Sequence, residues 1–115
     1  MRRDSRAYLW DVREAIDAIL GFTRGRTRDD FEKDLLLRSG VERQFEIIGE
    51  ALRLAIREEP DLAGLISDSS RIVAFRNRLI HGYAGVLSDV VWGILETNLP
   101  TLRMEVTRLL EGEAR

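Results

Sequence analysis

The spacing of apolar residues along the chain predicts long helices, and no segment has the alternating pattern of a strand. Apolar positions recur every three or four residues over about residues 4 to 22, which indicates a helix that Asp4 or Ser5 caps and Gly21 helps to end. A second long pattern covers about residues 39 to 58. Its main apolar stripe consists of Val41, Phe45, Ile48, Leu52 and Ala55. A second stripe, formed by Ile47 and Leu54, widens this apolar face. So wide an apolar face suits the centre of a bundle or a dimer seam.

Shorter patterns lie between and after these two helices. Thr27 and Asp30 resemble a capping box that opens a short helix through "RDDFEKDLL". The stretch "EEPDLAGLISDSS" is expected to form a loop with one weak turn. A fourth helix is expected from Ser69 or Ser70 to near Gly82, where glycine is a typical stop.

The last pattern begins at Ser88, which we expect to cap a fifth helix that continues to Leu109. Pro100 lies inside this pattern and should kink the helix. Together the patterns predict an all-α, up-and-down bundle of about five helices in a single domain over residues 1–115.

Composition narrows the kinds of chemistry open to the chain. Hydrophobic residues make up 44% and charged residues 33% of 115 positions, a globular balance with room for one core. The lack of cysteine excludes disulfides, thiolate catalysis and zinc held by cysteine, and a single histidine excludes a multi-histidine metal site within one chain. The start, "MRRDSRAYLW", has no long apolar run, so we expect no signal peptide, no membrane span and a cytoplasmic location.

The charged residues give a more local picture. The net charge of −2 argues against bulk binding of polyanions. Lys33 is the only lysine, so nearly all the positive charge comes from arginine, whose planar guanidinium suits phosphate. A composition bias of the source genome would explain the excess of arginine over lysine equally well. Four carboxylates lie in or next to the short helix: Asp29, Asp30, Glu32 and Asp34. Such a group first suggests a magnesium site, but acidic residues in a first turn more often interact with the helix dipole or lie on the solvated surface.

Two glycines and two glutamates stand out on the helix over residues 39 to 58. Gly40 and Gly49 each cost about 1 kcal/mol relative to alanine, and we expect them to let another backbone approach closely. Glu46 and Glu50 lie one turn apart, which suggests acid–base work or one wall of a cleft. Ion pairs with nearby arginines are the commoner role for such residues, and the candidates are Arg43 and Arg53.

The stretch "RNRLIHGYAG" gathers the polar groups with the most chemical reach. On an ideal helix Arg76 and Tyr83 lie about 20° apart, whereas His81 lies about 140° from Arg76 and shares a face with Asn77. Arg76 and His81 therefore converge only if the last turn unwinds at Gly82, if the long arginine side chain bends round, or if a two-fold partner supplies one of them.

A structural interpretation of the same stretch needs no reaction. Arg76, Asn77 and Arg78 would form a solvated helix surface, and His81 would sit near a helix C-terminus, where a cation suits the dipole. Tyr83 would pack against the bundle with its hydroxyl outward. Spacing alone does not decide between the two interpretations.

"RNRLIHGY" resembles the Arg, any four, His, any, Tyr signature of the HEPN superfamily, and more closely the HepT-like toxins that pair with minimal nucleotidyltransferase antitoxins. Three further segments resemble that family in the same order, so that the similarity covers about residues 4 to 105: "DSRAYLWDVREAIDAI", "FEKDLLLRSGVERQFEIIGEALRLA" and "VVWGILETNLPTLR". A Pro-Trp pair that similar proteins carry before the signature is replaced here by "AGLISDSSRIVAF".

The resemblance implies a HEPN-like fold and a metal-independent endoribonuclease toxin of a type II toxin–antitoxin system, with no cofactor. His81 would be the general acid or base, and Arg76 would stabilise charge on the phosphate, with Asn77 and Arg78 in support and the RNA's own 2′-hydroxyl as nucleophile. The motif tyrosine, Tyr83, would accept AMP from the antitoxin and so silence the toxin, or would stack or pack instead.

One histidine cannot readily both accept and donate the protons of the reaction, so we expect a homodimer that brings two copies of His81 to a shared cleft. Arg71, Arg76 and Arg78, doubled by symmetry, would make that cleft positive. Two alternatives have no catalysis: a nucleotide- or substrate-binding partner of a nucleotidyltransferase, and a purely structural dimeric bundle.

Overall fold

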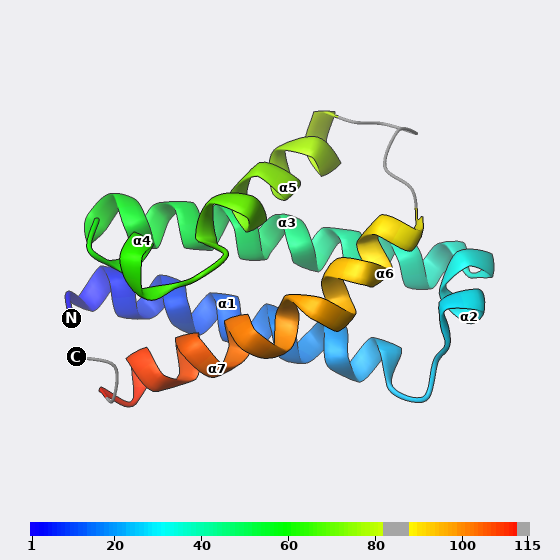
Figure 1. The fold of residues 1–115 in the computed structure, drawn as a ribbon, viewed down its shortest axis with the longest axis horizontal. Coiled ribbons are helices and arrows are strands. Elements are labelled where there is room, and N and C mark those ends of the chain that lie inside the picture. The colour runs from blue at the N-terminus through cyan, green and yellow to red at the C-terminus, as the bar shows by residue number, and fades with distance from the viewer. Residues whose placement is uncertain (82–87, 113–115) are drawn as a thin grey trace.

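Helices form all the regular structure in the residues that the computed structural model describes, 1–81 and 88–112 (Figure 1). In chain order they are α1 (Arg3–Thr23), α2 (Arg28–Lys33), α3 (Leu35–Glu58), α4 (Leu62–Leu65), α5 (Ser69–His81), α6 (Ser88–Thr97) and α7 (Leu99–Leu110). The prediction of an all-α bundle is therefore confirmed.

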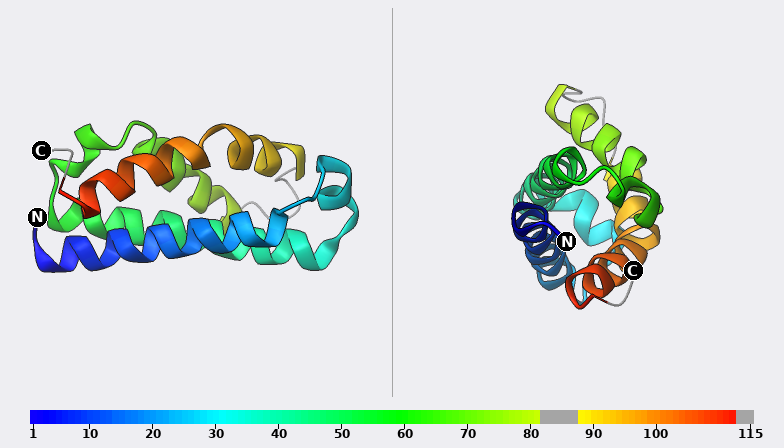
Figure 2. Two further views of the ribbon diagram at one scale, coloured as in Figure 1. Left: turned by 90° about the horizontal axis from the view of Figure 1, so that it is seen from below. Right: turned by 90° about the vertical axis from the view of Figure 1, so that its left-hand side faces the viewer.

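The centre of the bundle is the antiparallel pair α1 and α3, which lie side by side along most of their length (Figures 1 and 2). Leu9, Val12 and Ile16 of α1 are completely buried. The main stripe predicted for α3 is buried with them: Val41, Phe45, Ile48, Leu52 and Ala55. α7 lies against α1 and contributes Leu102 and Val106 to the same core.

Aromatic contacts join α2 to α6 and attach α5 to α3. The ring of Phe31 in α2 is completely buried and lies 5.4 Å from that of Trp92 in α6, measured between ring centroids. The rings of Phe45 in α3 and Phe75 in α5 meet edge to face, with centroids 5.3 Å apart. Such pairs contribute about 0.5–1.5 kcal/mol beyond the area that they bury.

The beginning of α5 is held by polar contacts from α7 and from Asn98, which lies between α6 and α7. Glu105 of α7 accepts hydrogen bonds from the backbone N–H of Ser67, at 3.1 Å, and from the Ser67 hydroxyl, at 2.6 Å. Asn98 donates to the carboxylate of Asp68 at 2.8 Å. These contacts, made just before α5 starts, fix the position from which α5 leaves the bundle.

The far end of α5 projects from the bundle (Figures 1 and 2). Its fully buried residues are Ser69, Ile72 and Phe75, all in its first half. Beyond Phe75 no residue of α5 is fully buried, and Ile80 is 39% exposed. The second half of α5, which carries the sequence motif, is therefore left largely uncovered by its own chain.

Gly49 brings α3 and α5 together just before α5 diverges. A Cβ atom placed on Gly49 would lie 2.2 Å from the Cβ of Arg76, which is far inside van der Waals contact. Because both atoms belong to side-chain stems, the overlap could be relieved only by moving one helix. The backbone carbonyl oxygen of Ile72 lies 3.5 Å from the same point, which confirms the expectation of a close backbone approach at Gly49. At Gly40 the nearest atoms belong to the ring of Phe22, so no backbone approaches there as closely.

Several predicted helix ends are wrong. α1 starts at Arg3 without a side-chain cap, so neither Asp4 nor Ser5 caps it, and it continues past Gly21 to Thr23. The Thr27–Asp30 capping box is confirmed in both directions, but α2 ends at Lys33. Leu35 already belongs to α3, four residues before the predicted start.

Asp34 explains this early start of α3. Its carboxylate accepts a hydrogen bond from the backbone N–H of Leu37 at 3.0 Å and so caps the new helix. The predicted loop over residues 59 to 70 does contain one short helix, α4.

The predicted fifth helix is two helices. α6 ends at Thr97, Asn98 separates it from α7, and Pro100 occupies the first turn of α7. Proline is well tolerated there because the first turn leaves its backbone N–H groups unpaired anyway. Pro100 therefore begins a helix where we expected it to kink one.

Gly49→Ala should destabilise the fold by about 1–3 kcal/mol, because the added methyl group would force α5 away from α3. Gly21→Ala is the matched control: it lies in α1, and nothing lies within 4 Å of the point that its Cβ would occupy, so alanine should stabilise by up to about 1 kcal/mol. Urea unfolding followed by circular dichroism measures both. Equal stabilisation by the two changes would contradict the close approach.

Candidate functional site

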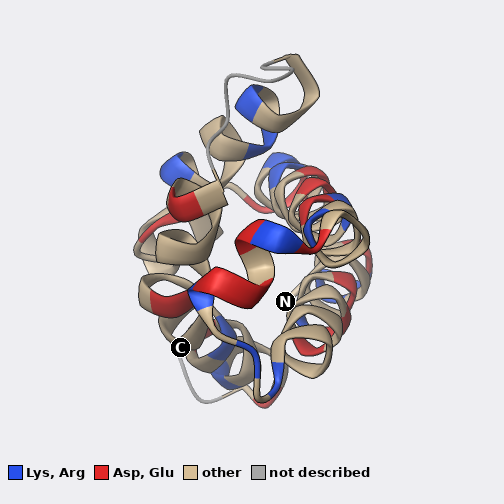
Figure 3. Cartoon of the chain, turned by 90° about the vertical axis from the view of Figure 1, so that its right-hand side faces the viewer, with Lys and Arg blue, Asp and Glu red and all other residues tan. Residues whose placement is uncertain are grey.

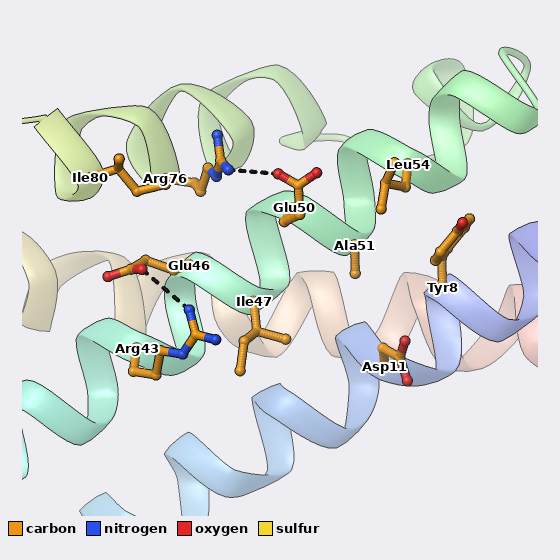
Figure 4. A pocket seen from close by; sticks show the side chains of 10 residues that line it. All are labelled: Tyr8, Asp11, Arg43, Glu46, Ile47, Glu50, Ala51, Leu54, Arg76 and Ile80. Carbon is orange, nitrogen blue, oxygen red and sulfur yellow. Dashed lines mark hydrogen bonds and ion pairs between the residues drawn. The ribbon is translucent and has the colours of Figure 1, made fainter.

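A groove of about 280 Å³ follows α3 on the side where it faces α1 and α5 (Figure 4). The side chains that line it come from three helices: Tyr8 and Asp11 of α1, Arg43, Glu46, Ile47, Glu50, Ala51 and Leu54 of α3, and Arg76 and Ile80 of α5. The second apolar stripe of α3, Ile47 and Leu54, thus lies in a surface groove and is only partly buried. Of the predicted site residues, Arg76 lines this groove.

Arg76 is the best-held residue of the motif. Its side chain is 23% exposed, and its Nη2 lies 2.6 Å from Oε2 of Glu50 (Figure 4). Its Nη1 donates to Oδ1 of Asn77 at 2.9 Å. Its Nε is buried with no hydrogen-bond partner among the described residues. The aliphatic stem rests on Gly49, so the guanidinium is restrained at both ends.

Glu50 joins two arginines. Its Oε1 lies 2.5 Å from Nη2 of Arg53, one turn further along α3, and its Oε2 pairs with Arg76 of α5. The hydrogen bond from Arg53 lowers the pKa of the Glu50 carboxyl below its usual value, and the positive charges of Arg53, Arg76 and Arg57 act in the same direction. The carboxylate is therefore ionised throughout the physiological range.

The ion pairs predicted for the two glutamates are confirmed. Arg43 lies 3.4 Å from Glu46, and Arg53 pairs with Glu50. Both glutamates also line the groove, as the cleft-wall interpretation expected. What the sequence did not reveal is the contact between Glu50 and Arg76, because no spacing rule relates residues on different helices; the adjacent Gly49 was its one available signal.

His81 lies apart from Arg76 within one chain. α5 remains α-helical through His81, so no unwinding precedes it, and the exposed imidazole is not part of the groove. Asn77 contacts Arg76, and its predicted partner His81 has no hydrogen bond within the described chain. Arg78 is exposed. Gly82 and Tyr83 lie outside the described residues.

The helix that carries the motif is basic although the whole chain is acidic. α5 contains Arg71, Arg76 and Arg78 and no carboxylate, so in Figure 3 its charged positions are all blue and the rest of it is tan. A projecting helix with three guanidinium groups produces a local positive potential that favours anions.

The carboxylates near α2 have structural partners. Asp29 pairs with Lys33 at 2.9 Å, Asp30 completes the capping box, and Asp34 caps α3. Over residues 1–81 and 88–112, no three carboxylate or imidazole side chains are arranged as metal ligands. None of the helices in that same part of the chain is both long enough and apolar enough to cross a membrane.

Comparison with known proteins identifies this all-α bundle as a ribonuclease of the HEPN type. Residues 12–109 match the family described as "Ribonuclease HepT-like", and the chain belongs to this family. The chain is accordingly an enzyme of the ribonuclease class.

Relatives of this chain carry names of the same kind. "Probable ribonuclease HepT" of Thermococcus cleftensis is 34% identical over 109 residues, which cover 95% of this chain and 98% of that protein. A "Putative RNase" of Methanocaldococcus jannaschii is 30% identical over 119 residues, covering 97% and 94% respectively.

One relative is longer than this chain. The "Gamma-glutamylcyclotransferase and putative RNase" of Methanocaldococcus jannaschii is 32% identical over 111 residues, and the match spans 96% of this chain but 50% of that protein. No solved structure matches the chain.

Proposed function

We propose that the protein is a metal-independent endoribonuclease toxin in which Arg76 and His81 act on one phosphodiester of RNA. The observation that carries this proposal is the restrained guanidinium of Arg76, which α3 holds at a groove five residues before the exposed His81 on the same basic helix. Membership of the HepT-like ribonuclease family supports RNA as the substrate.

The proposed reaction is an internal transfer. The 2′-hydroxyl of the RNA loses its proton to a base and attacks the adjacent phosphorus, and the bond to the 5′-oxygen breaks as that oxygen gains a proton. The products are a 2′,3′-cyclic phosphate and a 5′-hydroxyl. Histidine is suited to both proton transfers because imidazole ordinarily titrates near neutral pH. The guanidinium of Arg76 would stabilise the extra negative charge on the phosphate in the transition state.

The proposal includes a homodimer, because one chain separates its two reactive groups and supplies one imidazole. The uncovered half of α5 supports this: Ile80 is 39% exposed beside a groove that also contains the half-buried Ile47, Leu54 and Tyr8. A second copy seated there would cover apolar surface and bring its own α5 to the same place. Two copies of His81 would then serve as base and acid.

A toxin needs a means of silencing, and we propose that a cognate nucleotidyltransferase antitoxin adds AMP to the Tyr83 hydroxyl. The support is the resemblance of "RNRLIHGY" to the family signature, since Tyr83 lies outside the described residues. A bulky anion two residues from His81 would hinder the approach of RNA by its size and its charge.

Separation of Arg76 and His81 within the chain favours a second candidate function. Arg76 could hold a nucleotide phosphate in the groove without any cleavage, in which case the protein would be a binding partner of a nucleotidyltransferase. Removal of His81 would leave such binding intact, and this distinguishes the two candidates.

His81→Ala should lower the rate of RNA cleavage by about 10²- to 10⁴-fold, because a positioned proton donor or acceptor usually accelerates a reaction by that factor. Arg76→Ala should lower it by about 10²-fold or more, through loss of charge stabilisation. Arg108→Ala, which removes an arginine of α7 outside the groove, is the control and should leave the rate unchanged. Gel analysis of total RNA after expression in a host measures all three, and wild-type behaviour of His81→Ala would leave the binding function as the better explanation.

Ile80→Glu should convert the dimer to a monomer and abolish cleavage while the helical content stays unchanged, because a carboxylate would be buried at the seam. Met104→Glu is the matched control, since Met104 is a similarly exposed apolar residue, at 45%, on α7. Light scattering gives the mass and circular dichroism gives the fold. A monomeric wild-type protein that cleaves RNA at full rate would exclude the shared cleft.

Tyr83→Phe should abolish the gain of AMP when the protein is incubated with ATP, magnesium and its nucleotidyltransferase. Tyr8→Phe removes the other tyrosine of the chain and should be modified like the wild type. Intact-protein mass spectrometry counts the added nucleotides. Modification of Tyr83→Phe at the wild-type level would place the acceptor elsewhere.

A further inference from the structure

Glu50 is the one carboxylate in the groove that touches the proposed catalytic arginine, among the residues that the structure describes. Its two oxygens are divided between two helices: Oε1 lies 2.5 Å from Arg53 on α3, and Oε2 lies 2.6 Å from Arg76 on α5. Because each guanidinium has its own oxygen, neither arginine must release Glu50 for the other to bind. The carboxylate is thus fixed on α3 by Arg53 and is available to orient Arg76.

Two of the three guanidinium nitrogens of Arg76 have partners. Nη1 donates a hydrogen bond to Oδ1 of Asn77, and Nη2 forms an ion pair with Oε2 of Glu50. Nε is buried and has no hydrogen-bond partner among the described residues. Because a guanidinium carries five N–H donors, Nη1 and Nη2 keep donors for phosphate oxygens.

We propose that Glu50 is a positioning residue for RNA cleavage, which holds the guanidinium of Arg76 through their ion pair so that Arg76 meets the reacting phosphate. This inference rests on the proposed ribonuclease function. Glu50 itself touches no substrate atom; it acts through Arg76. Gly49 serves the same end, since it sets the distance between the helices that Glu50 then bridges.

The charge of Glu50 allows two opposite roles. Its carboxylate pairs with Arg53 and Arg76, and it lies in a groove whose charged lining residues are Asp11, Arg43, Glu46, Glu50 and Arg76. If Glu50 merely competed with phosphate for Arg76, its removal would strengthen RNA binding. If it positions Arg76, its removal should slow the chemical step, because an oriented guanidinium is more effective in the transition state than a mobile one.

Glu46 provides a matched control for charge. It lies one turn before Glu50 on the same helix, lines the same groove and carries the same charge (Figure 4). Its ion pair is with Arg43, at 3.4 Å, and it makes none with Arg76 within the described residues. Glu46→Ala therefore removes an equivalent negative charge without releasing the proposed catalytic arginine.

The kinetic experiment uses the full chain and a fluorophore-labelled pool of synthetic RNA oligonucleotides that contain all four bases. Glu50→Ala should lower kcat by about 10- to 100-fold, as expected for a misplaced catalytic group, with KM changed much less. Glu50→Gln should recover part of the loss, because its amide oxygen can still accept from one arginine. Glu46→Ala should lower kcat much less than Glu50→Ala, because Arg76 keeps its ion pair with Glu50.

Three results would overturn the proposal. A rise in kcat/KM for Glu50→Ala would make Glu50 a competitor of phosphate. Equal losses in Glu46→Ala and Glu50→Ala would indicate a general effect of charge. A loss of kcat in Glu50→Ala with no recovery in Glu50→Gln, accompanied by loss of helical circular dichroism, would indicate a role in folding alone.

A measurement without RNA separates this proposal from the proposed function. In nitrogen-15 NMR spectra of the wild type, the Nη hydrogens of Arg76 should give separate signals, because two contacts restrain rotation of the guanidinium; Arg76→Lys assigns them. These signals should merge in Glu50→Ala and persist in Glu46→Ala. Restrained signals in a protein that cleaves no RNA would refute the ribonuclease function alone, whereas a mobile Arg76 in an active wild type would refute the positioning role.

Discussion

The close approach of α3 and α5 at Gly49 is the constraint on which the candidate site depends. It places the stem of Arg76 directly on the backbone of α3, where a methyl group would already overlap with it. The edge-to-face pair of Phe45 and Phe75 holds the same two helices one turn away. Only at this separation can Glu50 reach across and share its carboxylate between arginines of both helices.

Much of the fold could be predicted because apolar periodicity reports burial directly. The stripe from Val41 to Ala55 is buried as its spacing indicates, and the Thr27–Asp30 capping box opens α2 because both of its hydrogen bonds are local. Helix ends were less predictable. Asp34 caps α3, which starts four residues before the predicted start, because a capping aspartate and a surface aspartate look alike in sequence. Pro100 begins α7, and proline in a first turn and proline at a kink also look alike.

In the candidate site, too, contacts between residues close in sequence could be predicted, whereas contacts between different helices could not. The motif itself, the family and the two glutamate–arginine pairs on α3 were accessible from sequence. The Glu50–Arg76 contact was not, because it depends on how two helices cross. The relation between Arg76 and His81 is a matter of helix geometry, and α5 keeps that geometry through His81: within one chain the two side chains leave the helix in different directions.

Under the proposed function, the projecting half of α5 would link assembly to chemistry. The last buried residue of α5 is Phe75, yet the helix continues to His81 and leaves Ile80 and His81 exposed in the described part of the chain. If a second chain covers this end, the fraction of protein with a complete site is set by mass action. Newly made protein at low concentration would then be mostly inert, and its potency would rise more steeply than its abundance, so dilution itself would act as a safeguard for the cell that makes it.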